Sequence, residues 1–555
     1  MKSLLTYSFF FISIATFSQQ EDAWLFFKDK PNSSTFIANP NSMLSQRAID
    51  RRNKLQISLD EKDVPIDENY ISSIKNIAGI TVLGKSKWLN ALHVRGEINL
   101  IKNLISSFNF IDHVEFADTS LNLSGKTKRK KIVSNHQNKW SKTLTDFNYG
   151  SANNQIKMLK GDYLHQQGLT GENQIIAVID AGFPNVNTLA AFQRIRDNNQ
   201  ILGGYNFADR NSNFYTRDSH GTSVLSTIAG YINNQFVGTA PDAKFYLFIS
   251  EIVESETVLE ETLWVEAAEK ADSLGVDVIN TSLGYTTYDN EDHSHSYQDM
   301  DGKTTFISRG AEIGASRGLL LVNAAGNEGN SAWKFIGAPA DAPSVISVGA
   351  VNSIGNIASF SSFGPTSDGR IKPEILAQGA NSAIINYSTG AINLSNGTSF
   401  SSPIMAGLIA CLNQFESGLL TSSKNSFVSK NDLLKKSVFE SADKYFNPQN
   451  QYGYGIPNFE TALNNYRIST ASIEDNLLIN LKISPNPVLN SFKIQNLEAF
   501  SGFYSLQIFN ILGKKVLEKQ IINETNIDIS NLKKGIYFAR IFRDKGSKTI
   551  KILKE

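Results

Sequence analysis

The stretch Ile175-Ile-Ala-Val-Ile-Asp180 decides the fold of this chain, because it is a short, continuous apolar run that ends in a carboxylate. Four further apolar runs follow it, at Lys244–Ile249, Val276–Ile279, Leu319–Val322 and Val345–Val348. A strand that is buried on both faces reads as a continuous apolar run, whereas a half-exposed strand alternates. These runs therefore predict the strands of a buried parallel sheet.

Helical segments separate several of these runs. Residues Val258–Leu274 carry apolar side chains at three- and four-residue spacing, which is the period of one helix face. Apolar strands that alternate with helices are typical of a sheet covered by helices on both faces. We therefore predict an α/β domain with a doubly wound parallel sheet over residues 155–467.

Smaller units flank this domain. Residues 19–125 combine predicted strands with an amphipathic segment at Ile98–Phe108, which indicates a small α+β domain. Residues 126–154 contain a basic run and a turn-like stretch, and we interpret them as a linker. Residues 477–555 carry short alternating strands and turns, which predict a C-terminal β-sandwich.

The N-terminus has the pattern of a secretory signal. Lys2 precedes an apolar stretch, Leu4–Phe17, which is too short to span a bilayer comfortably and is followed by Ser18. We predict that residues 1–18 are a signal peptide, with an uncleaved membrane anchor as the alternative. No later stretch has the roughly 18 uninterrupted apolar residues of a span, so we expect a soluble, exported protein without a membrane span.

Composition narrows the function classes. Lys+Arg and Asp+Glu both number 53, so the formal net charge is zero. Nucleic-acid-binding proteins usually carry a basic surplus, and this balance argues against that class. The single cysteine, Cys411, excludes an intrachain disulfide. Because it lies in an apolar run, we expect a buried, unreactive thiol and not a reactive one.

Three residues that nucleophilic catalysis uses stand in distinctive surroundings. Asp180 ends the first apolar run, at the edge where parallel sheets assemble their sites. His220 lies in Asp-Ser-His-Gly-Thr, just before a segment of small residues that reads as a helix. Ser399 lies in Asn396-Gly-Thr-Ser-Phe-Ser-Ser-Pro403, where glycine permits a tight turn and proline suits a first helical turn. Each residue alone has an ordinary alternative: a helix cap, a structural histidine or an N-cap serine.

The surroundings of Ser399 and Asn327 suggest stabilisation of negative charge. The segment Ile404–Phe415 is apolar almost all round, so we expect a buried helix with Ser399 at its amino end. Asn327 follows another apolar run, in Asn323-Ala-Ala-Gly-Asn-Glu-Gly329, and its amide could donate to an oxyanion. An asparagine that only forms a turn is the alternative.

Taken together, these blocks resemble the signature sequences of the subtilase family of serine proteases. They are Ile176-Ala-Val-Ile-Asp, His220-Gly-Thr, Ala324-Ala-Gly-Asn-Glu-Gly and Asn396-Gly-Thr-Ser-Phe-Ser-Ser-Pro, in the order Asp, His, Ser. The resemblance covers residues 155–467. It implies a serine endopeptidase that hydrolyses peptide bonds through an acyl-enzyme.

The resemblance also implies a role for each residue. Ser399 would be the nucleophile, His220 the general base and then acid, and Asp180 the carboxylate that orients the imidazole. Asn327 and the backbone N–H of Ser399 would form the oxyanion hole. The stretch Ser282-Leu283-Gly284 would be the edge strand that pairs with an extended peptide. Departures from the commonest pattern, at Val224, Phe400 and Ser401, put the substrate preference in doubt but remove no member of the triad.

The family needs no cofactor for catalysis, and we predict no catalytic metal. Structural calcium is common in relatives, but this sequence places no calcium site. The segment Asp289–Gly302 is rich in aspartate and histidine, yet it lacks the spacing of a calcium loop, so we expect an exposed insertion. Gly314-Ala-Ser-Arg-Gly318 matches the G-x-S-x-G nucleophile elbow, but a helix-like segment precedes it and a strand follows, so we interpret it as a chance match.

The flanking domains resemble precursor elements. Residues 19–125 resemble the propeptides of secreted subtilases, which assist folding and inhibit until removed; a permanent N-terminal domain is the alternative. The last block, from Ile483-Ser-Pro-Asn-Pro to Lys548-Thr-Ile-Lys-Ile-Leu-Lys554, resembles the C-terminal sorting domain of type IX secretion cargo. A carbohydrate- or protein-binding β-sandwich is the alternative. The resemblance implies a secretion machinery as partner and a location outside the cell or at its surface, beyond an outer membrane.

Two rival functions belong to other classes. A catalytically silent protease scaffold would act as a surface adhesin or binding protein, although all four catalytic positions hold suitable residue types. An esterase would use the same triad, although the predicted edge strand favours peptides. We therefore predict a secreted precursor whose partners are protein or peptide substrates.

Overall fold

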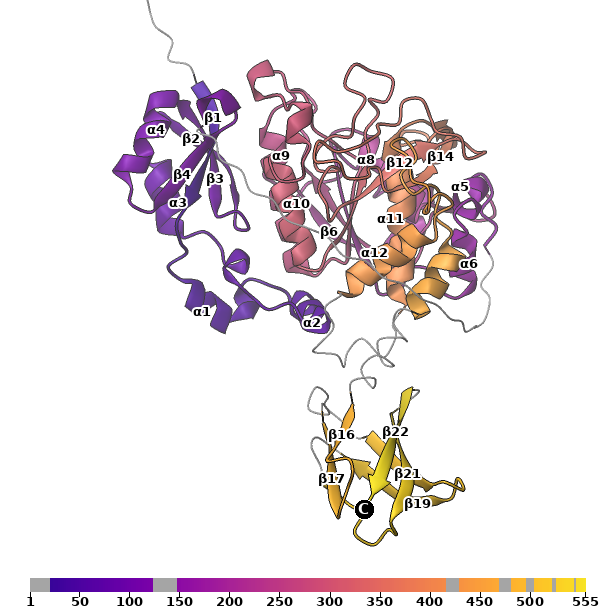
Figure 1. Cartoon of the computed structure of the whole chain (residues 1–555). Coiled ribbons are helices and arrows are strands. Elements are labelled where there is room, and N and C mark those ends of the chain that lie inside the picture. Colours follow the sequence, from indigo (N-terminus) through magenta and orange to yellow (C-terminus); the bar gives the residue numbers. More distant parts are fainter. Residues whose placement is uncertain are drawn as a thin grey trace, which may run out of the picture.

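The computed structural model describes residues 20–122, 147–415, 429–468, 481–495, 504–521, 526–543 and 546–555. The predicted signal peptide and the basic run of the predicted linker therefore lie outside the described residues. An N-terminal domain lies beside a large central domain, and a C-terminal domain follows (Figure 1). None of the helices in the described parts of the chain is both long enough and apolar enough to cross a membrane.

The central domain is built on a seven-stranded sheet of order β13-β12-β11-β10-β5-β9-β6. Each neighbouring pair in it is parallel. This confirms the predicted parallel sheet, and all five apolar runs become strands with small shifts at their ends. The strands are β5 (Ile175–Asp180), β6 (Ile201–Asn206), β9 (Lys244–Ile249), β10 (Val278–Thr281), β11 (Leu320–Ala324), β12 (Ile346–Val351) and β13 (Ile375–Gln378).

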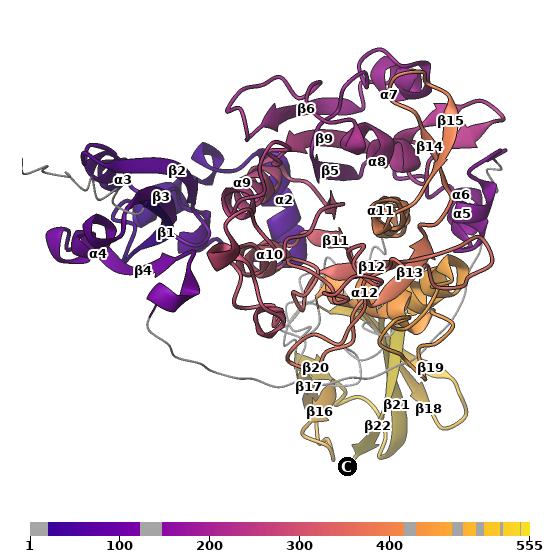
Figure 2. The ribbon, with the colours of Figure 1, turned by 90° about the horizontal axis from the view of Figure 1, so that it is seen from above.

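Helices cover both faces of this sheet, as Figure 2 shows from above. The side chains of β5 serve two separate cores in alternation: Ile176 and Val178 pack in one, while Ala177 and Ile179 pack in the other. Both faces of the strand are thus dry, which explains its continuous apolar sequence. The helices are α8 (His220–Ala229) and α11 (Thr398–Gln414) on one face, and α9 (Leu259–Leu274) and α10 (Phe306–Ser316) on the other.

The strand order also indicates where a binding or catalytic site can form. The chain builds the sheet on one side of β5 first, with β6 and β9, and then crosses to β10 on the other side. Loops that leave the carboxyl ends of β5 and β10 therefore diverge, and sites of open parallel sheets form at such a point.

The N-terminal domain has a four-stranded sheet of order β2-β3-β1-β4, with antiparallel pairs. Successive side chains of its first strand point to opposite faces. Leu25 packs inside the domain, whereas Trp24 and Phe26 pack in the core that includes α9 and α10. The Trp24 ring stacks on Phe306 of α10 at a centroid distance of 4.9 Å. The predicted α+β domain is confirmed. Its elements include β1 (Gln20–Phe27), β2 (Ile80–Ser86), β3 (Ala91–Glu97), β4 (Ile111–Phe116), α3 (Glu68–Lys75) and α4 (Ile98–Ser107).

Helices α1 (Ser33–Ala38), α2 (Gln46–Leu55) and α3 and strand β2 of this part were not predicted. The first two helices lie in the connection between β1 and α3. Figure 1 shows this connection leaving the N-terminal sheet and bringing α2 to the central domain.

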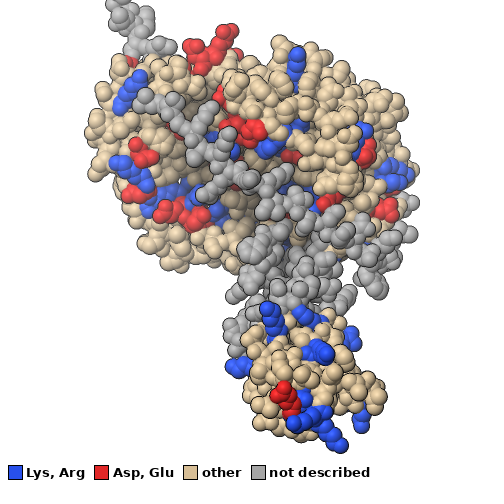
Figure 3. Space-filling view, in the orientation of Figure 1, with Lys and Arg blue, Asp and Glu red and all other residues tan. Residues whose placement is uncertain are grey.

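The C-terminal domain has two antiparallel sheets, of orders β16-β17-β20 and β19-β18-β21-β22. Side chains from both sheets, among them Phe492 and Leu506, share one core, which confirms the predicted sandwich. On the face in Figure 3, this domain shows more basic than acidic side chains. The strands are β16 (Lys482–Ser484), β17 (Ser491–Gln495), β18 (Tyr504–Asn510), β19 (Lys515–Ile521), β20 (Asn526–Asp528), β21 (Gly535–Arg543) and β22 (Gly546–Lys554).

Candidate active site

Asp180 and His220 meet at the carboxyl end of β5. Asp180 is fully buried as the last residue of β5, and His220 begins α8. Nδ1 of His220 lies 2.7 Å from Oδ1 of Asp180, which also accepts the N–H of Ala181 at 2.8 Å. A carboxylate bonded to Nδ1 fixes the ring and leaves Nε2 as the nitrogen that faces away from it.

The charge around His220 favours its protonated form. Burial of the ring opposes protonation, but the carboxylate of Asp180, with a smaller contribution from Asp218, outweighs burial and raises the pKa of His220 above its ordinary value. The side chain of His220 is 31% exposed, so it remains open to a ligand.

Ser399 lies in the first turn of α11, close to His220. The ring of the next residue, Phe400, lies 6.2 Å from the His220 ring. The Ser399 hydroxyl donates to the carbonyl of Ser282 at 3.3 Å. No hydrogen bond joins Ser399 to His220, both of which the structure describes, because the Ser399 hydroxyl is engaged with the Ser282 carbonyl.

The helix that carries Ser399 begins earlier than we predicted. It starts at Thr398 and not at Ile404, so Pro403 lies inside it. Proline has no N–H, so it cannot bond the carbonyl four residues before it, which is that of Ser399. The hydroxyl of Ser282 donates to this carbonyl at 2.9 Å instead, and the two serines are thus joined by two hydrogen bonds.

Gly397 explains how the chain enters this helix. Its φ of 150° lies in a region that side chains rarely adopt. A Cβ atom there would also lie 3.7 Å from the Ser399 hydroxyl. This distance is an ordinary contact, so it is the backbone conformation, and not crowding, that favours glycine at this position.

Asn327 lies beside the same turn. Its side-chain oxygen accepts the N–H of Thr398 at 2.9 Å and the Thr398 hydroxyl at 3.1 Å. Because these contacts occupy the oxygen, the amide nitrogen is the end that remains available to a ligand. The Thr398 hydroxyl also accepts the N–H of Gly326 at 3.2 Å, which ties the two loops together. Sequence analysis missed Thr398, although its place between Gly397 and Ser399 was a signal.

The stretch Ser282–Gly284 follows β10 and is not part of a strand. A segment that lacks a neighbouring strand forms no ladder of hydrogen bonds, whether or not it can pair with a peptide. Asn323 donates to the Leu283 carbonyl at 3.0 Å, and Asn280 donates to the Ser282 hydroxyl at 3.2 Å. Gly284 is exposed. Asn280 was also missed by sequence analysis, because it lies just after the predicted strand Val276–Ile279.

The segment Asp289–Gly302 is only in part the exposed insertion that we expected: residues 289–292, Ser296 and Gln298 are exposed, but others are covered. His293 is buried and lies 2.6 Å from Glu21 of the N-terminal domain, and His295 lies 2.7 Å from Glu261 of α9. The histidines pair with carboxylates because the N-terminal domain and α9 cover them. Within the described residues, no group of three or more His, Cys, Asp or Glu side chains could hold a metal ion.

Two other interpretations are confirmed. Cys411 is buried, and burial raises the pKa of its thiol well above the ordinary value. Gly314–Gly318 lies at the end of α10 and before β11, the reverse of the strand-to-helix order that a nucleophile elbow requires.

Comparison with known proteins agrees with this geometry. The family model "Subtilase family" matches residues 171–455, which is half of the chain. The model "Peptidase S8 propeptide domain, Bacteroidota" matches residues 22–136, and "Secretion system C-terminal sorting domain" matches residues 482–555. The chain belongs to the subtilase family and is a subtilisin-like serine endopeptidase with a propeptide domain and a secretion sorting domain.

Several relatives share the central domain. Subtilisin NAT of Bacillus subtilis subsp. natto is 32% identical over 315 residues, which cover 55% of this chain and 70% of the relative. Subtilisin of Bacillus pumilus is 32% identical over 315 residues, covering 55% of this chain and 97% of the relative. The solved structure of the prenylagaramide maturation protease PagA is 23% identical, with a TM-score of 0.42, over 55% of this chain and 98% of that one.

Proposed function

We propose that Ser399, His220 and Asp180 form the catalytic triad of this protease and that peptide bonds are cut through an acyl-enzyme on Ser399. The observation that carries the proposal is the 2.7 Å contact between the His220 imidazole and the buried Asp180 carboxylate, at the same sheet edge as Ser399. An adhesin has no need of a buried charge pair beside a helix-start serine, so this contact favours catalysis.

The proposed reaction has two halves. Nε2 of His220 takes the Ser399 proton while Oγ forms a bond to the carbonyl carbon of the substrate. The imidazolium then gives the proton to the departing amine as the C–N bond breaks, which leaves an ester on Ser399. Water, deprotonated by the same imidazole, attacks the ester and restores the hydroxyl. Asp180 keeps the ring oriented and stabilises its charge throughout.

The negative oxygen of the intermediate needs donors. Asn327 supplies its amide nitrogen, since its oxygen is engaged by Thr398. The backbone N–H of Ser399 is the second proposed donor, because the first-turn N–H groups of a helix have no helical partner. Ser282–Gly284 is the proposed peptide-binding edge, since it begins at Ser282, which contacts Ser399, and ends two residues later at the exposed Gly284. An extended edge selects peptides over simple esters.

The remaining regions complete a precursor. We propose residues 1–18 as a signal peptide, 19–125 as the propeptide, 126–154 as a linker, 155–467 as the peptidase domain and 477–555 as the sorting domain. Export would then take the protein across an outer membrane to the cell surface or beyond, with protein or peptide substrates there. No cofactor takes part in the proposed chemistry.

A covalent probe tests the triad directly. A fluorophosphonate reacts with an activated serine, so we expect it to modify Ser399 and no other residue of the purified protease with the N-terminal domain removed. Peptide mass spectrometry identifies the modified residue. Ser401, two residues on and fully buried, is the internal control. Labelling of another serine, or none at all, would contradict the proposal.

Asn327→Asp separates the oxyanion role from a structural one. The aspartate keeps an oxygen for the two Thr398 donors but loses the amide donor and adds a charge. We expect kcat for peptide hydrolysis to fall about 10²- to 10³-fold or more with little change in KM, since loss of one oxyanion donor has this size in a related site. Steady-state kinetics on a chromogenic peptide measures both constants. A variant with unchanged kcat would remove Asn327 from the mechanism.

A further inference from the structure

The N-terminal domain contacts the central domain over a broad surface. Its sheet packs Trp24 and Phe26 against α9 and α10, and Ser86 and Trp88 donate to Glu269 of α9. At one end of this surface, α2 lies against residues that precede strands: Asn173 before β5, Asp277 before β10 and Gly318 before β11. Asp180 of the proposed triad is the last residue of β5, so α2 docks at the opposite end of the same sheet.

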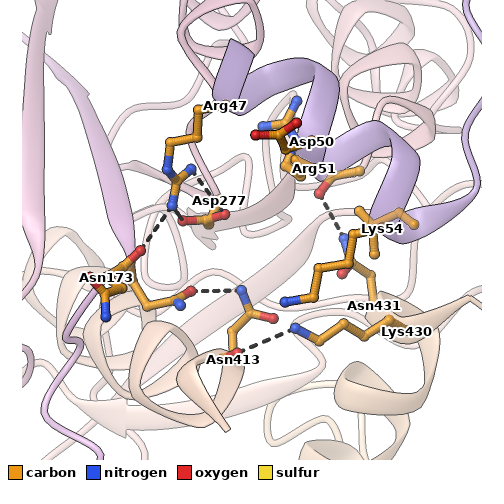
Figure 4. Close-up of a pocket in the computed structure, with 12 residues that line it drawn as sticks. Arg47, Asp50, Arg51, Lys54, Asn173, Asp277, Asn413, Lys430 and Asn431 are labelled. Atoms are coloured by element: carbon orange, nitrogen blue, oxygen red, sulfur yellow. Dashed lines mark hydrogen bonds and ion pairs between the residues drawn. The ribbon is translucent and has the colours of Figure 1, made fainter. Parts of the chain in front are cut away.

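Three arginines of α2 make this second contact, and we call Arg47, Arg51 and Arg52 the arginine clasp. Arg47 lies 2.7 Å from Asp277 and donates to the Asn173 carbonyl at 2.9 Å (Figure 4). Arg51 and Arg52 both bind the carboxylate of Asp272 in α9, one to each oxygen. Arg52 is 1% exposed and Asp272 is fully buried, so the ion pair between them is shielded from solvent.

Each domain supplies both arginines and carboxylates to this contact. Arg52 also binds Asp63 of its own domain at 2.8 Å. Arg317 of the central domain lies 3.4 Å from Asp63 and 3.0 Å from Asp60, both of the N-terminal domain. Among the described residues, Asp272 has no hydrogen-bond donor to its side chain other than the arginine clasp. Without the arginine clasp, this buried carboxylate would be left unpaired.

The shape of the central domain fits α2 as well. A Cβ atom at Gly275 would lie 2.8 Å from the backbone nitrogen of Ala48, and one at Gly318 would lie 2.5 Å from the Leu55 side chain. Only glycine permits so close an approach at these points, and both have positive φ, at 81° and 94°. A pocket of about 210 Å³ lies beside the contact, and Arg47, Arg51 and Asp277 are among the residues that line it.

We propose that the amino end of the peptidase sheet, together with the C-terminal end of α9, is a dedicated docking surface for the arginine clasp, and that it anchors the propeptide in addition to the sheet contact made by Trp24 and Phe26. The carboxylates Asp272 and Asp277 are its recognition elements. The proposal rests on the propeptide assignment and on this interface, and it does not depend on the catalytic roles of Ser399, His220 or Asp180.

The test uses the full chain made inert by Ser399→Ala, with a unique protease site in place of residues 126–131. After this site is cut, the rate at which the N-terminal segment leaves is followed by size-exclusion chromatography. We expect Arg51→Met and Asp272→Asn each to raise this rate about 30-fold or more, because truncation of one partner in a buried charge pair acts on the dissociation rate. Asp272→Asn leaves the N-terminal segment itself unchanged.

Arg309→Met is the matched control. Arg309 pairs with Glu115 on the α10 side, but both side chains are partly exposed, at 25% and 32%, so its loss should change the rate by only a few-fold. If Arg51→Met fails to fold, Asp272→Asn carries the test, because it changes the central domain and leaves the arginine clasp itself intact. Dissociation at the parent rate in the folded Asp272→Asn protein would overturn the proposal.

Discussion

Ser399→Ala should lower kcat for peptide hydrolysis by about 10⁶-fold, a magnitude taken from subtilisin-type triads and not from this geometry. The alanine removes the oxygen that forms the covalent bond and that donates to the Ser282 carbonyl in the free enzyme. Cleavage of casein by the purified protein, with the N-terminal domain removed, measures the loss. The variant precursor should also stay full length on a gel if the protease matures itself.

Ser401→Ala provides the matched control for this variant. Ser401 belongs to the same helix turn, is fully buried and donates to the Thr398 carbonyl at 2.9 Å. Its change tests the same loss of a hydroxyl in the same helix without touching the proposed nucleophile. We expect activity within a few-fold of the parent. Equal losses in both variants would mean that the helix, and not the Ser399 oxygen, is what the reaction needs.

Asp180→Asn should lower kcat about 10⁴-fold, since the amide no longer holds the imidazole in the required tautomer. It should also move the pH dependence. In the parent, neutral His220 is the base, and its pKa is raised above the ordinary value of 6.5 by Asp180 against the effect of burial. Activity of the parent should therefore fall as the pH drops through a midpoint above 6.5. Without the Asp180 charge, burial prevails, and the residual activity should fall at a lower pH.

Rate profiles of kcat/KM against pH measure both effects. Asp218→Asn is the control, because Asp218 raises the pKa of His220 more weakly and binds only the His220 backbone N–H, at 2.8 Å. It should move the acid limb slightly in the same direction with a much smaller loss of kcat. An acid limb that stays in place in Asp180→Asn would show that the group titrating in the parent is not His220.

Local sequence was sufficient for the strands of the central sheet. A strand that is buried on both faces must be apolar on both faces. Ile175–Asp180 and the four other apolar runs can therefore be recognised from their own sequence, without knowledge of the neighbouring strands. Helix α11 was harder, because Pro403 suggested a first turn. Its start at Thr398 depends on Ser282, more than a hundred residues away, which supplies the hydrogen bond that proline cannot make.

The residues that compose the candidate site, and the class of protein to which they belong, were determined by the sequence itself, since short motifs record which side chains the chemistry uses. The tertiary structure alone decided what supports them: the Thr398 contact that orients Asn327, the burial of His293, and the docking of α2 at the far end of the sheet. These features arise between segments distant in the chain. An arginine in a helix carries no mark of the carboxylate it will meet, because burial and pairing are properties of the assembled fold.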